Sequence, residues 1–285
     1  MKNLLLTGSS GFIGQYFFQN YASKYNIKTF SFLNDSFELL KLEEIDTVIH
    51  LSALVHQMGG ATKEEYYKVN VNQTVALAKR AKRRGVLHFI FMSSVKVYGE
   101  ETDTPYTEQS KCLPQDDYGK SKLMAEEELK LLEDDDFRVS IIRTPIVYGY
   151  GVKANIKNLI HLVDKVPILP FGDINNRRSM VYIGNLCYLI DCVVQQSKRG
   201  VFLASDDETY STKKLILLIA EKLNKRVFLL KIPFFKKILK IAKPSFYKRL
   251  YESLEIDNQW SKRELKLDNP YSFEDGIDLT MNLSN

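Results

Sequence analysis

The sequence predicts an α/β fold with a doubly wound parallel sheet, and three observations predict it. Apolar runs of strand length alternate with segments of helical periodicity. The chain opens on a strand that runs into a glycine-rich turn, and its 45% hydrophobic content suits a packed core. From these patterns we expect strands at 2–7, 28–32, 47–52, 88–94, 138–145 and 201–205, with helices at 13–24, 36–44, 63–83, 117–133 and 185–197.

The first fourteen residues, MKNLLLTGSSGFIG, predict a phosphate-binding turn between a buried strand and a helix. Gly8 permits the tight turn, Gly11 lets a diphosphate approach the backbone, and Gly14 lets the helix pack close to the strand. The free N–H groups and the positive end of the helix dipole favour an anion there. The expected guest is a dinucleotide, NAD or NADP; the alternative is a glycine-rich turn that binds nothing.

The interval after the second predicted strand is short. From Phe32 to Thr47 there are about fourteen residues, which is enough for only one parallel crossover. We therefore expect the sheet to lack one strand after the second, leaving the adenine side of the dinucleotide open. The acid that binds a cofactor ribose should end the second strand, but Ser31 stands there, Asp35 comes late, and no Arg replaces it. This position does not separate NAD from NADP.

Composition excludes several classes of protein. The chain of 285 residues has no run of 18 apolar residues, so no membrane-spanning helix is expected. The apolar run near its N-terminus is too short for a signal peptide, so we expect a cytoplasmic protein. The three cysteines are scattered, and neither they nor the four histidines have the spacing of metal ligands. We expect no metal.

The net charge of +5 is unevenly distributed. Residues 222–249 contain ten Lys or Arg and no acid, interleaved with aromatic residues. This segment has three interpretations: a solvated helix face, a docking surface for an anionic substrate, or a peripheral contact with the anionic inner face of a membrane. No nucleic-acid recognition motif accompanies the charge, so nucleic acid is not an expected partner.

Two further segments contain residue types that can transfer a proton to or from a substrate and hold a substrate oxygen. Tyr118 and Lys122 lie four residues apart, on one face of a clear helical stretch. An ammonium near a phenol lowers its pKa toward neutrality, so that the phenol exchanges protons. The strand at 88–94 ends in Ser93 and Ser94, where a doubly wound sheet presents its site and a hydroxyl can hold a substrate oxygen.

Taken together, these motifs resemble the extended short-chain dehydrogenases/reductases, in the NAD-dependent epimerase/dehydratase branch that acts on nucleotide sugars. The resemblance covers most of the chain: TGSSGFIG, HLSALVH at 50–56, Asn70 within KVNVNQT, SSVKVYG, YGKSK, RTPIVYGYGVKAN at 143–155 and NNRRSMVYIGNL at 175–186. The resemblance is strongest to the 4-epimerases and 4-keto reductases of bacterial surface-polysaccharide synthesis.

The resemblance implies a Rossmann fold and a role for each matching residue. The catalytic residues would be Ser94, Tyr118 and Lys122. The cofactor would contact Thr7, Gly8, Gly11, Phe12, Ile13, Gly14, Ser31, Leu51, Ser52, Ala53, Asn70, Tyr118 and Lys122. The substrate, a UDP-sugar, would contact His56, Ser94, Asn155 and Arg178.

Two reactions fit this set of residues. An epimerase keeps its NAD bound through many turnovers, whereas a reductase must exchange spent cofactor in each cycle. The missing strand and the absence of an acid for the cofactor ribose suggest looser cofactor binding, which favours a reductase. We therefore expect reduction at C4 of a UDP-4-keto-6-deoxy-(N-acetyl)hexosamine. The alternatives are a UDP-sugar 4-epimerase with tightly held NAD, acting on a soluble or a lipid-linked sugar, and a non-catalytic cofactor-binding scaffold.

The change in composition after residue 150 predicts two parts. Residues 1–150 form the dinucleotide-binding domain, to which 180–205 return, and residues 151–285 form a smaller substrate-binding lobe. The resemblance also implies a homodimer through the helices near 63–83 and 117–133, as is common in that family.

Overall fold

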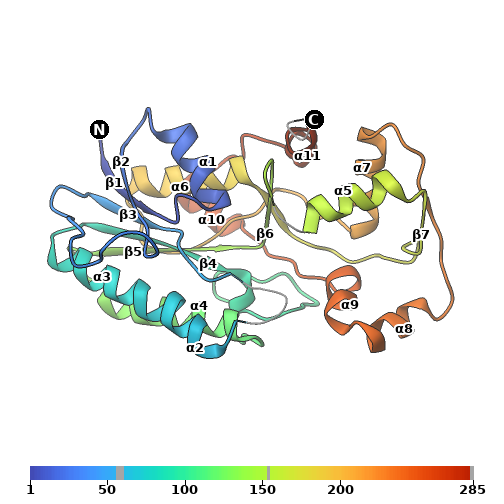
Figure 1. The fold of residues 1–285 in the computed structure, drawn as a ribbon, viewed down its shortest axis with the longest axis horizontal. Coiled ribbons are helices and arrows are strands. Elements are labelled where there is room, and N and C mark those ends of the chain that lie inside the picture. Colours follow the sequence, from blue (N-terminus) through green and yellow to red (C-terminus); the bar gives the residue numbers. More distant parts are fainter. Residues whose placement is uncertain (56–60, 153–154, 283–285) are drawn as a thin grey trace.

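A computed structural model describes residues 1–55, 61–152 and 155–282 of the chain. Its centre is a six-stranded sheet in which all strands are parallel (Figure 1). The strands, in their order across the sheet, are β2 (Asn26–Phe30), β1 (Asn3–Thr7), β3 (Thr47–His50), β4 (His88–Ser94), β5 (Arg138–Thr144) and β9 (Gly200–Leu203). The predicted fold class, a doubly wound α/β sheet, is confirmed.

Helices cover both faces of this sheet (Figure 1). One face carries α1 (Phe12–Tyr21), α6 (Ile183–Gln196) and α10 (Gln259–Leu265); the other carries α2 (Lys63–Tyr66), the π-helical turn η1 (Tyr67–Gln73), α3 (Thr74–Arg83) and α4 (Asp117–Leu132). Alternate residues of β1 enter separate cores: Leu4 and Leu6 share one with Phe17, whereas Leu5 shares the other with Leu77. This is why the strands read as continuous apolar runs.

The strand expected to be missing is missing. All of residues 31–46 are described, none is in a strand, and β2 lies at the edge of the sheet. The helix expected at 36–44 is wrong, because these residues form turns. Phe37 packs against Phe30, and Arg80 of α3 donates to the carbonyl oxygens of Glu38 and Leu40 at 2.8 and 2.7 Å. A distant side chain therefore takes carbonyls that a helix would use internally.

The remaining elements extend beyond the carboxyl ends of the strands (Figure 1). They include two short parallel pairs, β6 (Ile146–Tyr148) with β8 (Met180–Tyr182) and β7 (Ile168–Leu169) with β10 (Phe228–Leu229). The helices of this part are α5 (Asn155–Lys165), α7 (Thr212–Lys222), α8 (Phe235–Ala242), α9 (Pro244–Tyr251) and α11 (Phe273–Asn282). We call these elements the C-terminal lobe; its boundary at residue 150 stays a prediction.

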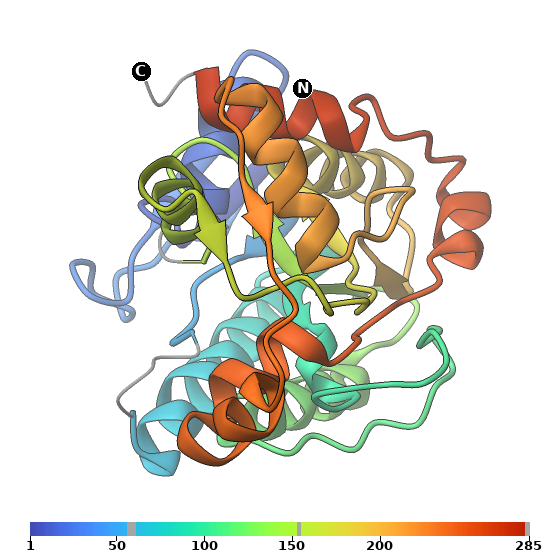
Figure 2. The ribbon, with the colours of Figure 1, turned by 90° about the vertical axis from the view of Figure 1, so that its right-hand side faces the viewer.

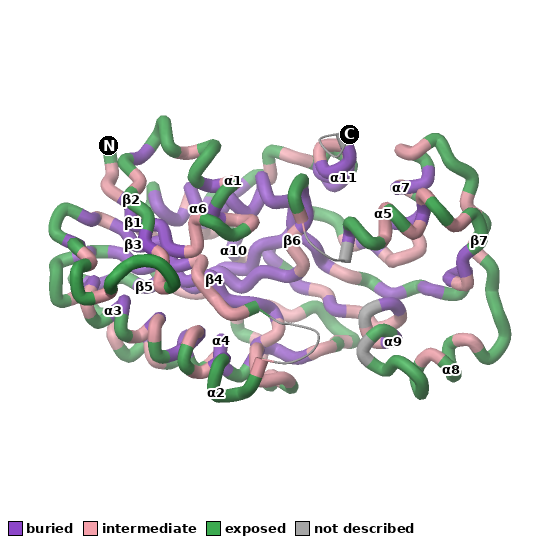
Figure 3. Tube along the Cα trace, viewed as in Figure 1, coloured by how far each residue is buried: buried purple, intermediate pink, exposed green. Residues whose placement is uncertain are grey.

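Burial follows this arrangement (Figure 3). Buried residues are concentrated in the sheet, α6 and the β6–β8 pair, whereas the chain around β10 and α8 is largely exposed. Within the described ranges, no helix has both the length and the apolar character needed to cross a bilayer.

Candidate active site

The glycine turn between β1 and α1 has the shape expected for binding a diphosphate. Gly8 has φ +71°, and a Cβ there would lie 2.7 Å from the backbone nitrogen of Ser52. A Cβ on Gly14 would lie 2.2 Å from the carbonyl oxygen of Gly8, so α1 packs directly on the turn. Gly11 is the N-cap residue of α1 and has no side chain to cap the helix, and no acid occupies the first helical turn. Its first amides are therefore available to an anion, and the residues fit a dinucleotide.

Thr7 connects the glycine turn to the neighbouring strand. Its hydroxyl lies 2.7 Å from Nδ1 of His50 and accepts a hydrogen bond from the N–H of Ser52 at 3.3 Å. Nε2 of His50 lies 2.9 Å from the hydroxyl of Thr74 on α3. Burial lowers the pKa of His50 to about 3, so the imidazole is neutral. The Thr7 side chain therefore holds the ends of β1 and β3 in register. The predicted cofactor residues Leu51, Ser52 and Ala53 come directly after β3.

Asn70 joins the segment after β3 to the helix that carries the predicted catalytic pair. It is fully buried within η1. Its Oδ1 accepts from the N–H of Leu54 at 2.8 Å, and its Nδ2 donates to the carbonyl of Leu54 and to the hydroxyl of Ser121, both at 3.0 Å. π-Helical turns are frequent at functional sites. His56, a predicted substrate residue, lies outside the described residues.

Ser94 and Tyr118 meet at the carboxyl edge of the sheet. Ser94 ends β4, and its hydroxyl lies close enough to the phenol of Tyr118, the second residue of α4, to lower the pKa of that phenol. Lys122, one turn along α4, is 2% exposed, and its Nζ donates to the carbonyl oxygen of Met92 at 2.8 Å. A Cβ on Gly119 would lie 2.6 Å from the carbonyl oxygen of Lys96, so this glycine lets α4 approach the serine segment.

Electrostatics in this site differ from our expectation. Burial raises the pKa of Tyr118 to about 12, and the nearby hydroxyl of Ser94 opposes that rise. The expectation of a lowered pKa is wrong for the protein without cofactor, because the loss of water around the phenolate dominates. Burial also lowers the pKa of Lys122 to about 7, partly offset by Glu126. The site thus holds a neutral phenol beside an amine that titrates near neutrality.

A buried ion pair behind the site was not anticipated from the sequence. Glu126 continues the stripe of Tyr118 and Lys122 along α4, and its Oε1 accepts from Nε of Arg143 on β5 at 3.0 Å. Ser93 donates its hydroxyl proton to the same carboxylate, so it faces this pair. In the sequence, the only sign of this ion pair was the i, i+4, i+8 spacing of Tyr118, Lys122 and Glu126, which puts Glu126 on the same helical face.

Two of the predicted substrate residues, Asn155 and Arg178, lie beyond Ser94, in the C-terminal lobe. Ser94 pairs with Thr144 across the sheet, and two residues later Ile146 lines a pocket of about 310 Å³. Arg178 lines the same pocket, and its Nη1 donates to the carbonyl oxygen of Glu252 at 3.0 Å. The other walls are mostly apolar and include Leu159, Phe171, Met180, Tyr210 and Leu250. Asn155 is the first residue of α5.

The predicted ribose position is occupied by a local turn. Ser31 follows β2, and its N–H donates to Oδ2 of Asp35 at 2.8 Å. Its hydroxyl accepts from the N–H of Leu33 at 3.3 Å. Asp35 therefore closes this turn, and its carboxylate is partly engaged by it. The cofactor contact predicted for Ser31 stays a prediction.

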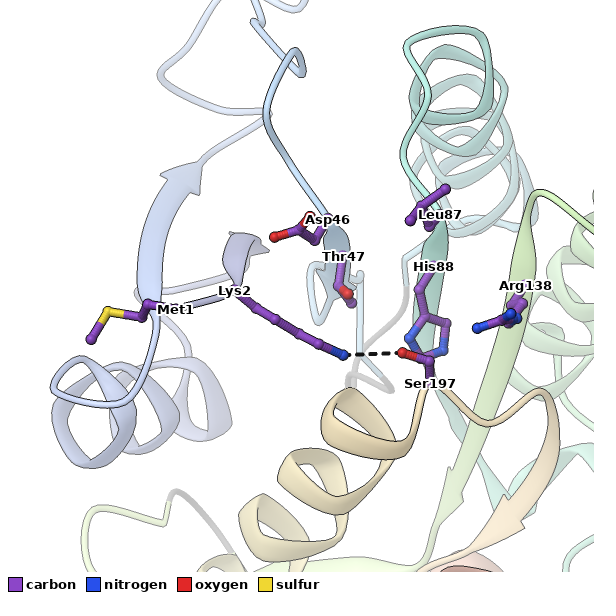
Figure 4. Close-up of a pocket in the computed structure, with 8 residues that line it drawn as sticks. All are labelled: Met1, Lys2, Asp46, Thr47, Leu87, His88, Arg138 and Ser197. Atoms are coloured by element: carbon purple, nitrogen blue, oxygen red, sulfur yellow. Dashed lines mark hydrogen bonds between the residues drawn. The ribbon is translucent and has the colours of Figure 1, made fainter.

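A second hollow, of about 380 Å³, lies at the amino ends of the strands (Figure 4). Lys2 reaches across it to the hydroxyl of Ser197 at 3.1 Å, and His88 and Arg138 form part of its wall. Because the glycine turn, Ser94 and Tyr118 lie at the carboxyl ends, this hollow is separate from the candidate active site.

Known sequences that match this chain include nucleotide-sugar epimerases and a reductase. Residues 4–203 match the NAD dependent epimerase/dehydratase family. The chain is 36% identical to a UDP-glucose 4-epimerase of Vibrio cholerae, covering 98% of this chain and 94% of that protein. It is 28% identical to an N-acetyl-alpha-D-glucosaminyl-diphospho-ditrans,octacis-undecaprenol 4-epimerase of Escherichia coli O157:H7, covering 81% and 76%. It is also 28% identical to a dTDP-4-dehydro-6-deoxyglucose reductase of Escherichia coli, covering 79% and 83%.

Solved structures share the fold. A UDP-glucuronic acid 4-epimerase from Bacillus cereus in complex with NAD has a TM-score of 0.79 at 20% identity, covering 98% of this chain and 97% of that one. A dTDP-4-dehydrorhamnose reductase from Bacillus anthracis in complex with NADP has a TM-score of 0.76 at 18% identity, with both chains fully covered.

Proposed function

The chain belongs to the NAD dependent epimerase/dehydratase family, and from that premise we propose that it is a 4-epimerase of a nucleotide-linked sugar, most simply a UDP-sugar. The observation that carries the proposal is the meeting of Ser94, at the end of β4, with Tyr118 and the buried Lys122, one helical turn apart on α4. The 36% identity to a UDP-glucose 4-epimerase over 98% of the chain favours this reaction over the reduction that we first expected.

The glycine turn would hold the cofactor. The diphosphate would lie against the first turn of α1, because Gly8 and Gly14 let the turn and the helix pack closely and Gly11 has no side chain to block its approach. The bound dinucleotide would accept and return a hydride at the sugar carbon and, when oxidised, would bring a positive charge. The family binds NAD or NADP, and Ser31 and Asp35 do not select between them.

Tyr118 is the proton carrier in this proposal. With a pKa of about 12 it is a neutral phenol at neutral pH, able to donate a proton to an alkoxide on C4. Ser94, whose hydroxyl lies near the Tyr118 phenol, would donate to the same oxygen as its charge develops. For the opposite step the acceptor must be the phenolate of Tyr118, which takes the proton of the C4 hydroxyl; forming this phenolate at neutral pH requires a lower pKa of Tyr118. The protonated amine of Lys122 supplies positive charge on the same helical face.

The pocket beside Arg178 is the proposed nucleotide subsite. Arg178 is the charged side chain in its lining, and a guanidinium suits a diphosphate, which it can bind in a bidentate manner. The apolar walls, such as Leu159 and Phe171, provide surface for the base. Ile146 connects this pocket to the strand that pairs with Ser94, so a substrate would extend from one to the other.

The second candidate is a C4 keto-reductase. The observation in its favour is that β2 is the edge strand and that Asp35 is engaged by its own turn, which reduces the contacts available to hold a cofactor between turnovers. Similarity to a dTDP-4-dehydro-6-deoxyglucose reductase adds support.

Cofactor retention separates the two candidates. The protein would be purified without added nicotinamide, its bound dinucleotide quantified, and UDP-glucose and UDP-N-acetylglucosamine tested by NMR with no cofactor added. The epimerase predicts nearly one bound dinucleotide per chain and interconversion of C4 epimers. A cofactor-free protein that consumes NADH or NADPH only with a UDP-4-keto-sugar would contradict the epimerase and establish the reductase.

A further inference from the structure

The helix α8 exposes an apolar stripe. Ile238 and Ile241 are three residues apart, so they share one side of the helix, and they are 62% and 84% exposed. Phe234, which directly precedes the helix, is 72% exposed. Their neighbours Phe235 and Leu239 pack against the hydrophobic core. The rest of the protein thus covers only part of the apolar side of α8.

The same end of the C-terminal lobe exposes further apolar side chains. Ile168 and Phe228 are register partners in the β7–β10 pair, and both are exposed. Leu230 and Ile232 continue from β10 toward α8, along the chain that faces the viewer in Figure 2. We call this set the end surface; its members are Ile168, Phe228, Leu230, Ile232, Phe234, Ile238 and Ile241.

Basic side chains flank the end surface. Residues 222–251 contain no acid and ten Lys or Arg. The first two are neutralised, because Lys222 pairs with Asp278 and Lys225 pairs with Asp164. On α8, Lys236 and Lys240 lie over the rings of Tyr251 and Tyr247, so they are on the side of the helix that faces α9.

We propose that the end surface docks on an anionic phospholipid membrane. A helix with an exposed apolar side and lysines on the other lies in the plane of a bilayer, with its apolar side at the boundary of headgroups and acyl chains. Anionic headgroups complement the positive charge. A second copy of the chain is a poorer occupant, since it would bring two surfaces of like charge together. This docking goes beyond the proposed reaction and does not depend on it.

Flotation of the full chain with vesicles tests the docking. Vesicles of phosphatidylglycerol mixed with phosphatidylcholine should carry the protein, less so at high salt, and vesicles of phosphatidylcholine alone should not. Ile238→Ser with Ile241→Ser should lower the partition coefficient about tenfold by removing apolar contact. Lys236→Glu with Lys240→Glu should lower it by at least about tenfold through repulsion.

Leu131→Ser with Lys130→Glu is the matched control, because both residues are exposed on α4, away from the end surface. The control should float as the unchanged protein does. Absence of flotation, or flotation that the α8 variants leave unchanged, would overturn the proposal. A dimer that the α8 variants dissociate in sedimentation would overturn it too, by assigning the surface to a second copy. All variants should keep their turnover of a soluble nucleotide sugar, so this test is independent of the reaction.

Discussion

Asn70 donates a hydrogen bond from Nδ2 to the hydroxyl of Ser121 at 3.0 Å. This bond joins η1 to α4, which carries Tyr118 and Lys122. Ser121 in turn donates to the carbonyl oxygen of Tyr118 at 2.8 Å. The orientation of the candidate catalytic helix is therefore coupled to the segment after β3, where Asn70 holds both backbone groups of Leu54.

Asn70→Leu should weaken both stability and cofactor binding. The change leaves the N–H of Leu54 and the hydroxyl of Ser121 without their buried partner, at a cost of about 1–3 kcal/mol in the free energy of unfolding. Urea unfolding and titration with NAD measure the two effects. Asn72→Leu, at an exposed position two residues away, is the control and should change neither. If Asn70→Leu and Asn72→Leu have the same stability and the same affinity for NAD, the coupling is contradicted.

Tyr118→Phe should lower turnover by about 10²–10⁴-fold with little change in unfolding, because it removes only the hydroxyl that would transfer the proton. Product formation followed by NMR measures the effect. Tyr188→Phe on α6, across the sheet, is the matched control and should retain full activity. An active Tyr118→Phe protein would show that another group carries the proton.

Lys122→Met should flatten the dependence of stability on pH. The folded state lowers the pKa of Lys122 from 10.5 to about 7, so between these values the unfolded chain binds more protons and stability rises with pH. Below about pH 7 the folded protein must bury a charge, and Met removes that cost. Urea unfolding at about pH 6 and about pH 10 should show a gain for Lys122→Met at the lower pH.

The exposed Lys120 provides the control for that experiment. Lys120→Met, two residues away on the same helix, should keep the dependence on pH of the unchanged protein. Activity should be lost in Lys122→Met and kept in Lys120→Met. If the stabilities of Lys122→Met and the unchanged protein differ by the same amount at every pH, the lowered pKa of Lys122 is refuted.

Gly14→Ala should abolish tight dinucleotide binding. The added Cβ would lie 2.2 Å from the carbonyl oxygen of Gly8, so α1 must move away from the turn and its amides must leave the diphosphate. We expect an affinity for NAD at least about tenfold lower, measured by calorimetric titration. Gln15→Ala, on the exposed side of α1, should bind normally. Normal binding by Gly14→Ala would place the dinucleotide elsewhere.

Glu126→Leu should be strongly destabilising. It leaves Arg143 buried without its carboxylate, which costs about 3–5 kcal/mol in the free energy of unfolding. The double variant Glu126→Leu, Arg143→Met should recover much of that loss, because no charge is then left buried. Denaturant unfolding measures both, and the exposed Glu127→Leu is the control. A double variant no more stable than Glu126→Leu would disprove this account.

The features that the sequence predicted correctly have local causes. Gly8 and Gly14 have fixed places in a strand–turn–helix unit, and the four-residue spacing of Tyr118 and Lys122 puts them on one helical face by geometry alone. The missing strand followed from chain length, since residues 31–46 allow one crossover. The helix expected at 36–44 was wrong because Arg80, some forty residues later, takes its carbonyls.

By itself the sequence determined the parallel sheet, the glycine turn between the first strand and the first helix, and the order of the candidate catalytic residues, because each depends on neighbours along the chain. Only the tertiary structure decided the hydrogen bonds of Asn70, the Glu126–Arg143 pair and the protonation of the site. Burial sets the pKa values of Tyr118 and Lys122, and burial depends on which distant elements exclude water from a side chain.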